Sequence, residues 1–139
     1  MRGTIWLGVA VLGTMLAAAG CSSTNCPCRL TAAKVGAKGM VRHVVLFSFK
    51  ADAPPEKIKE IEAAFRALPS KVPGILGFEW GTNISPENHA QGYTHCFFLT
   101  FGDTKARDAY LPHPAHKAFG ASLGPYLDKV LVIDYVAQD

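Results

Sequence analysis

VRHVVLFSF at residues 41–49 decides the fold of this chain. Its β-branched and aromatic residues are typical of a β-strand, in which alternate side chains point to opposite faces of a sheet. KVLVIDYV at residues 129–136 is the last strand that the pattern predicts. Both stretches carry apolar residues on both faces of the strand. In the first, Val45, Phe47 and Phe49 fall on one face, and Val44 and Leu46 on the other. An antiparallel sheet with one face in water alternates apolar with polar residues, so both faces of this sheet are expected to be covered.

The segment between these two strands predicts two helical regions and two further strands. A turn at 52–55 leads into an amphipathic helix, which we expect Pro69 to end; its apolar residues recur at helical spacing, at Ile58, Ile61, Phe65 and Leu68. A strand, a polar loop, a strand, a short helix and a helix with Pro114 in its first turn follow at residues 75–80, 83–92, 94–101, 104–111 and 115–123. The order β-α-β-β-α-β predicts an α+β, ferredoxin-like fold with a four-stranded antiparallel sheet and both helical regions on one face.

The sheet face without helices needs a partner. About 100 residues supply one modest core and leave no element to cover a second apolar face. A second copy of the chain is the simplest cover, with two sheets closing face to face into a dimeric α/β barrel. The pattern therefore predicts a homodimer.

The first twenty residues have the features of a secretory signal. Arg2 supplies a positive charge, residues 5–19 are almost wholly apolar, and the small residues 18–20 precede Cys21. Cys21 after small residues resembles the bacterial lipobox, in which the cysteine is lipidated and the signal removed; an uncleaved anchor helix is the alternative, although the run is short for a span. The predicted organisation is a signal peptide at 1–20, the lipidated Cys21 and a flexible tether at 21–39, and one domain at 40–139.

This organisation predicts a protein of the bacterial cell envelope, anchored to the membrane through lipid. Ser22 and Ser23 after the cysteine favour the outer membrane if the host has two membranes. Cys26, Cys28 and Cys96 remain, an odd number that cannot form a closed set of internal disulfides, so we expect free thiols or a bridge between chains. The net charge of +3 comes from scattered basic residues, a pattern that does not suggest nucleic acid as a partner.

Residues 110–116, YLPHPAH, combine aromatic, imidazole and proline side chains. Four further pieces accompany them in order: His43-Val-Val-Leu-Phe, Gly81-Thr-Asn-Ile-Ser, Gly92-Tyr-Thr-His95 and Val132-Ile-Asp-Tyr135. In this set of motifs, residues 40–136 resemble the stress-responsive A/B barrel (Dabb) family. The resemblance implies a dimeric α+β barrel. A plant polyketide cyclase of that family performs an aldol condensation with a tyrosine and a histidine, and those positions correspond to Tyr110 and His116.

The roles of these side chains stay open at the level of sequence. His116 could act as a base, because the helix dipole disfavours its charged form, and Tyr110 could donate to a carbonyl group. The same segment could instead secure the helix junction, with His113 capping the helix that follows. His43 and His95 are expected to line one cavity, with Trp80 in its wall or in the core and His113 as a further ligand-binding candidate, whereas His89 should lie in solvent. No fixed ligand spacing and no acidic residue tied to the histidines supports a metal site.

We therefore expect a lipid-tethered dimer whose cavity binds a small apolar or aromatic molecule, or which has a stress-related role, without catalysis and without a cofactor. The alternative is a polyketide-cyclase-like enzyme with His116 as base and Tyr110 as carbonyl donor. A purely structural envelope protein is a third reading.

Overall fold

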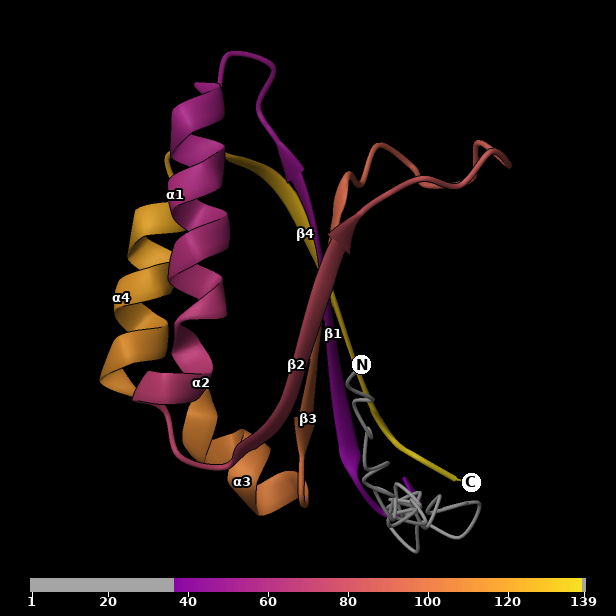
Figure 1. The fold of residues 1–139 in the computed structure, drawn as a ribbon, viewed down its shortest axis with the longest axis vertical. Coiled ribbons are helices and arrows are strands. Elements are labelled where there is room, and N and C mark those ends of the chain that lie inside the picture. Colours follow the sequence, from indigo (N-terminus) through magenta and orange to yellow (C-terminus); the bar gives the residue numbers. More distant parts are fainter. Residues whose placement is uncertain (1–36, 139) are drawn as a thin grey trace, which may run out of the picture. The chain divides into compact units, whose positions relative to one another are not determined.

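The computed structural model describes residues 37–138, which belong to a compact unit spanning Lys34–Asp139. The predicted signal peptide, Cys21, Cys26 and Cys28 lie outside the described residues. The elements in chain order are β1 (Val41–Phe49), α1 (Pro55–Arg66), α2 (Leu68–Lys71), β2 (Ile75–Thr82), β3 (His95–Phe101), α3 (Thr104–Tyr110), α4 (Pro114–Leu123) and β4 (Leu127–Val136). Figure 1 shows the helices gathered on one side of the sheet.

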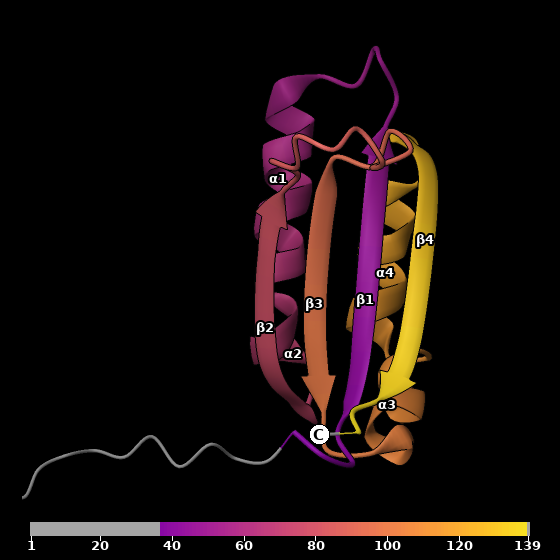
Figure 2. The same cartoon turned by 90° about the vertical axis from the view of Figure 1, so that its right-hand side faces the viewer.

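The four strands form one sheet in the order β2-β3-β1-β4, and every neighbouring pair is antiparallel. β1 therefore lies in the interior of the sheet, while β2 and β4 are its edges (Figure 2). The register pairs Val45 with both Phe97 and Val132, so their side chains share one face. The predicted ferredoxin-like α+β fold is confirmed.

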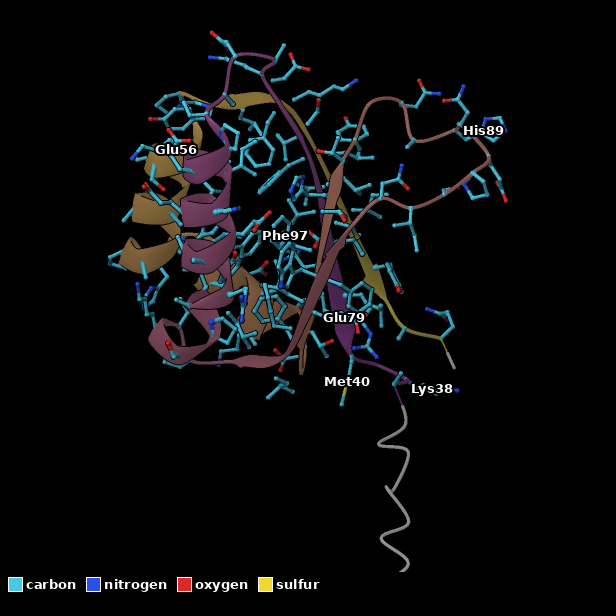
Figure 3. The ribbon with its side chains drawn as sticks, turned by 45° about the horizontal axis from the view of Figure 1, so that its top comes forward. Lys38, Met40, Glu56, Glu79, His89 and Phe97 are labelled. Carbon is cyan, nitrogen blue, oxygen red and sulfur yellow. The ribbon has the colours of Figure 1, made fainter. Side chains whose placement is uncertain are left out.

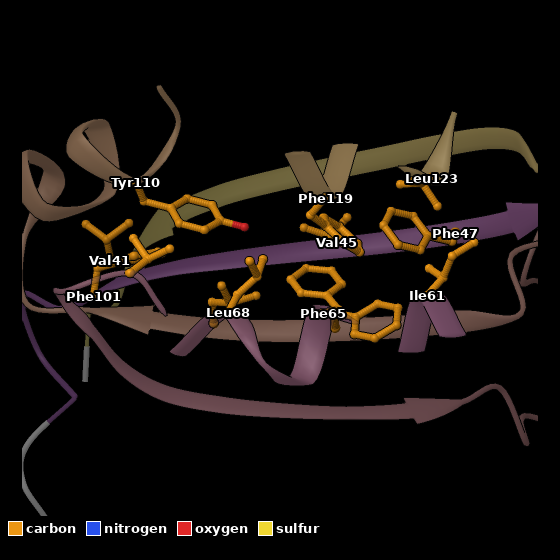
Figure 4. Close-up of a cluster of buried hydrophobic side chains, with 13 residues drawn as sticks. Val41, Val45, Phe47, Ile61, Phe65, Leu68, Phe101, Tyr110, Phe119 and Leu123 are labelled. Atoms are coloured by element: carbon orange, nitrogen blue, oxygen red, sulfur yellow. The ribbon is translucent and has the colours of Figure 1, made fainter. Parts of the chain in front are cut away.

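The core lies between the sheet and the helices. Residues 41, 43, 45 and 47 of β1 are buried, and the alternating residues of β3 pack beside them (Figure 4). Phe65 of α1 is 1% exposed and stacks on Phe97, whose ring centroid is 4.3 Å away. Figure 3 places Phe97 between the helices and the sheet. Each large apolar side chain buried in this way contributes roughly 1.5–3 kcal/mol to folding. This is why β1 needs apolar residues on the face towards the helices.

The opposite face of the sheet carries the other set of alternating apolar residues. No helix covers this face (Figure 2). Val44, Leu46 and Phe98 lie half-buried at its centre. On β4, Leu131, Ile133 and Tyr135 are 39%, 48% and 46% exposed. The described part of the chain thus leaves uncovered the face for which the sequence predicts a cover.

The structure corrects the expected helix end at Pro69. α1 ends at Arg66, and the short α2 begins at Leu68 with Pro69 in its first turn. A proline is compatible with a first turn because the amide hydrogen it lacks would have no partner inside the helix. Val72 behind it is 2% exposed, so α2 closes the end of the core.

Three strand boundaries also differ from the expected ones. β2 runs two residues further, to Thr82, and β4 begins two residues earlier, at Leu127. β3 begins at His95, one residue later than expected. Pairing with a neighbouring strand extends an element beyond its apolar pattern, which explains the longer edge strands. Within residues 37–138, no helix is long and apolar enough to span a bilayer.

Candidate functional site

A cavity of 290 Å³ lies between the helices and the inner face of β1 and β4. Its apolar wall comes from side chains of β1, α1 and α4, namely Val45, Phe47, Phe65, Phe119 and Leu123. Its polar end is formed by His43, Tyr110, His116 and Asp134. The volume is at the lower limit of the range of about 300–1,000 Å³ that is typical of small-molecule sites. This arrangement suits a compact molecule with an apolar body and one polar end.

Tyr110 places a buried hydroxyl group at the polar end. It is the last residue of α3, and its side chain is 1% exposed. Within the described residues the hydroxyl has no hydrogen-bond partner, and it points into the cluster of core side chains (Figure 4). Burial raises the pKa of Tyr110 above its ordinary value of 10, so the group is a neutral donor at physiological pH. A buried hydroxyl without a partner costs about 1–3 kcal/mol, and a bound acceptor would recover part of that cost.

His116 lies beside Tyr110 in the first turn of α4. The two ring centroids are 4.3 Å apart. Nδ1 of His116 lies 2.9 Å from the carbonyl oxygen of Leu111. A carbonyl oxygen only accepts, so Nδ1 carries the hydrogen and Nε2 of the neutral ring keeps its lone pair. Tyr110 and His116, the two positions to which the resemblance points, thus lie side by side at the polar end of the cavity.

His113 has a different place. It is the N-cap of α4, where its Nδ1 accepts a hydrogen bond of 3.2 Å from the backbone N–H of Ala115. Pro114 occupies the next position, which fixes the backbone for the first turn. The predicted capping role of His113 is confirmed, and His113 does not line the cavity.

His43 enters the cavity from β1 and is tied to an acidic side chain. Its Nδ1 lies 2.7 Å from Oδ1 of Asp134 on β4, and its ring packs edge-on to Tyr110 at 5.7 Å between centroids. Burial lowers the pKa of His43 below the ordinary 6.5, against the opposing effect of the Asp134 carboxylate. The other oxygen of Asp134 accepts from the guanidinium of Arg107 on α3. Sequence reasoning expected no acidic residue at the histidines and overlooked both Asp134 and Arg107; the acidic residue inside the apolar β4 was the available signal.

The expectation that His43 and His95 line one cavity is wrong. His43 pairs with Leu99, whereas His95 pairs with Phe47. Because β1 and β3 are antiparallel, their starts lie at opposite ends of the sheet, and four residues of strand separate the two histidines by about 13 Å. His95 instead contacts Thr94 at 2.8 Å and Glu62 of α1 at 3.1 Å, and lines a separate hollow under the β2–β3 loop.

The remaining predicted residues lie away from the cavity. Trp80 stacks on Phe97 at 5.7 Å between ring centroids and packs against the core without lining the cavity. His89 lies at the tip of the β2–β3 loop (Figure 3). Among residues 37–138, no group of three or more His, Cys, Asp or Glu side chains could hold a metal ion.

Comparison with known proteins connects this geometry to a family. The model of the stress responsive A/B barrel domain, Dabb, matches residues 41–137. The stress-response A/B barrel domain-containing protein HS1 of Arabidopsis thaliana is 46% identical over 99 residues, which are 71% of this chain and 91% of that protein. Olivetolic acid cyclase of Cannabis sativa is 28% identical over 98 residues, 70% of this chain and 97% of the cyclase.

Solved structures agree with the fold. A crystal structure of an Arabidopsis thaliana protein is 43% identical, with a TM-score of 0.68 and coverage of 71% of this chain and 96% of that one. A hydroxynitrile lyase from Passiflora edulis is 26% identical with a TM-score of 0.68, covering 72% and 94%. A dimeric protein of ferredoxin-like fold from Bacteroides fragilis is 29% identical with a TM-score of 0.60, covering 72% and 98%. The chain belongs to the stress responsive A/B barrel domain (Dabb) family.

Proposed function

We propose that this protein is a lipid-tethered homodimer of the bacterial cell envelope whose Dabb domain binds a small apolar or aromatic molecule without transforming it. The observation that carries the proposal is the hydroxyl group of Tyr110, which is buried, has no hydrogen-bond partner within residues 37–138 and belongs to a side chain that lines the cavity. A donor held in this way favours a ligand with a carbonyl or other acceptor at one end. The apolar wall favours a hydrocarbon or aromatic body at the other.

The dimer in this proposal rests on two observations. The helix-free face exposes Leu131, Ile133 and Tyr135 side by side on β4. A relative of the same fold from Bacteroides fragilis is dimeric. Contiguous exposed apolar surface of this kind is typical of an interaction face.

The second candidate function is catalysis, in which a proton is removed from a carbon atom next to a carbonyl group. Nε2 of His116 is left with a lone pair beside the donor Tyr110, which is the pairing that proton removal next to a carbonyl group requires. Two relatives, olivetolic acid cyclase and the hydroxynitrile lyase, are enzymes. We place this candidate second because the same contacts of His116 and His113 secure the α3–α4 junction.

The domain can be studied by itself. Residues 34–139 form one compact unit with its own core. The matched regions make up 91% of HS1 and 97% of olivetolic acid cyclase, so relatives of this size contain little beyond the same domain. Residues 34–139 are therefore the material for the binding and stability experiments below.

Tyr110→Phe tests the binding proposal, because it removes the unpaired hydroxyl and keeps the ring. We expect the variant to melt several degrees higher, since a buried unpartnered hydroxyl costs about 1–3 kcal/mol. We also expect its affinity for acetophenone to fall by roughly 2- to 10-fold, whereas affinity for isopropylbenzene, which has the same shape but no carbonyl group, should stay unchanged. Ligand-observed NMR and thermal melts measure the two effects.

Tyr126→Phe is the matched control, because Tyr126 lies outside this cavity, and it should change neither ketone affinity nor the preference between the two probes. A Tyr110→Phe variant that melts lower and binds both probes like the wild type would sink the proposal. Mass spectrometry of small molecules that copurify with the full-length protein then identifies the natural ligand.

A further inference from the structure

Three side chains from three elements form a continuous chain of contacts that ends in the cavity. Arg107 of α3 donates from Nη1 to Oδ2 of Asp134 on β4, and Oδ1 of Asp134 lies 2.7 Å from Nδ1 of His43 on β1. The Arg107 and Asp134 side chains are 18% and 30% exposed, and His43 is 4% exposed. The chain thus runs from a partly solvated guanidinium to a buried imidazole. Neither the sequence motifs nor the family match assigns a role to Arg107.

The contacts decide which nitrogen of His43 carries the hydrogen. A carboxylate only accepts, so Nδ1 of His43 donates to Asp134 and Nε2 of the neutral ring keeps its lone pair. His116 has the same tautomer because its Nδ1 donates to the carbonyl oxygen of Leu111. Both rings line the cavity and pack against Tyr110. In the described part of the chain neither Nε2 has a hydrogen-bond partner, so the polar end offers two acceptors around one donor.

We propose that Arg107 is a positioning residue: by binding Oδ2 of Asp134, it keeps the carboxylate turned towards His43, which holds Nε2 of His43 as an acceptor for a hydrogen-bond donor on the ligand. This inference rests on the proposed binding function and deepens it, since it adds a hydroxyl or similar donor to the acceptor that Tyr110 requires. A single oxygen of Asp134 is left for His43 because the guanidinium occupies the other. The carboxylate therefore cannot rotate away without breaking both contacts.

The charges around His43 influence which protonation state its ring adopts. The titratable groups that face His43 are Asp134 from β4, Arg107 and Tyr110 from α3, and His116 from α4. Burial lowers the pKa of His43 most, the Asp134 carboxylate opposes it, and the charges of His116 and, least of all, Arg107 add to the lowering. Arg107 thus makes a small contribution against uptake of a second proton by His43, which would remove the acceptor at Nε2. Replacing Arg107 by a neutral residue should raise the pKa of His43 and leave the carboxylate free to pair with an imidazolium.

A merely structural role for Arg107 predicts different behaviour. The contact with Asp134 also ties α3 to β4, and an ion pair of this exposure is typically worth about 0–1 kcal/mol. Loss of such a clamp would lower the melting temperature slightly and leave the tautomer of His43 as it is, although the titration midpoint would still move because the charge of Arg107 is gone. The tautomer of His43 therefore separates the two roles.

The experiment is long-range ¹H–¹⁵N NMR of residues 34–139 labelled at histidine, which distinguishes protonated from bare ring nitrogens without any ligand. In the wild type we expect His43 to have a hydrogen at Nδ1 and a bare Nε2. In Arg107→Leu, the titration midpoint of His43 should move to higher pH and its two tautomers should mix. Arg107→Lys should restore most of the wild-type behaviour because it restores the charge. Arg66→Leu on the exposed side of α1, and the signals of His89, are the controls and should not change.

A binding arm uses 3-hydroxyacetophenone and 3-methylacetophenone, which differ by one donor at similar size. We expect the wild type to prefer the hydroxy compound by roughly 2- to 10-fold and Arg107→Leu to lose that preference. A hydrogen on Nε2 of wild-type His43, or a His43 tautomer that Arg107→Leu leaves unchanged, overturns the inference. If the NMR results are as expected but the wild type binds neither ketone, the role of Arg107 in fixing His43 stands and the proposed binding function fails.

Discussion

Tyr110 and His116 are six residues apart and meet at the polar end of the cavity, but only one of them is hydrogen-bonded. His116 is anchored by the carbonyl oxygen of Leu111, whereas the hydroxyl of Tyr110 has no partner among residues 37–138. A side chain that is hydrogen-bonded within the fold stabilises the fold even when no ligand is bound. A buried donor that is left unpaired costs stability until something binds, so Tyr110 is the better indicator of function.

His116→Ala separates the two candidate functions at this scale. Its bond to Leu111 joins the first turn of α4 to the end of α3, so we expect its loss to cost about 0.5–1.5 kcal/mol, or several degrees of melting temperature. We expect affinity for acetophenone to change little and no polyketide cyclisation in the wild type. His89→Ala in the exposed loop is the control and should leave the melting temperature unchanged.

A different outcome would favour the enzyme. Loss of a general base typically lowers turnover by about 10²–10⁴-fold. Cyclase activity in the wild type that disappears in a fully stable His116→Ala protein would replace binding by catalysis as the function of the cavity.

At the scale of elements, the sheet has two apolar faces and one layer of helices. β1 alternates so that odd residues enter the core and even residues, among them Val44 and Leu46, reach the helix-free face. β4 continues that face with Leu131 and Ile133, which pair with Leu46 and Val44. β1 and β4 thus supply a physical cause for the proposed dimerisation, because covering this surface would remove apolar area from water.

Ile133→Glu tests the helix-free face as the dimer interface. Ile133 is 48% exposed in the single chain, so a glutamate there is compatible with the folded domain. In a dimer it would be an unpaired buried charge, which is costly. We expect residues 34–139 to be dimeric in light scattering and the variant to be a folded monomer. Ala63→Glu on the exposed side of α1 should remain dimeric. A well-folded wild-type monomer at tens of micromolar would contradict the proposed interface.

At the scale of the whole molecule, the domain is proposed to stand at the end of a lipid-anchored tether. The sequence evidence is the run of small residues before Cys21, which lies outside the described residues. We expect Cys21→Ala to abolish labelling of the full-length protein by a clickable fatty acid in a bacterial host and to leave an unprocessed or unlipidated form. Cys96→Ala is the matched control and should label like the wild type. Equal labelling of the wild type and Cys21→Ala would remove the anchor from the proposal.

Sequence patterns were sufficient for the architecture because they are local. Runs of β-branched and aromatic residues identified β1 and β4, and helical spacing identified α1. The two-sided pattern of β1 also predicted that the face without helices is apolar. The predicted helix end at Pro69 was wrong because a proline can either end a helix or lie in the first turn of one. The packing of Leu68 and Val72 places Pro69 in the first turn of α2.

Only the tertiary structure shows which residues line the cavity. Tyr110 and His116 could be paired from sequence because one short segment holds both. His43 and Asp134 are 91 residues apart, and Arg107 and Asp134 are 27 apart. Their meeting depends on the register of β1 against β4 and on where α3 crosses the end of the sheet. The register of β1 against β3 places His95 at the opposite end of the sheet from His43. Side-chain periodicity assigns a residue to a face, but only strand pairing sets its position along that face, and the cavity depends on both.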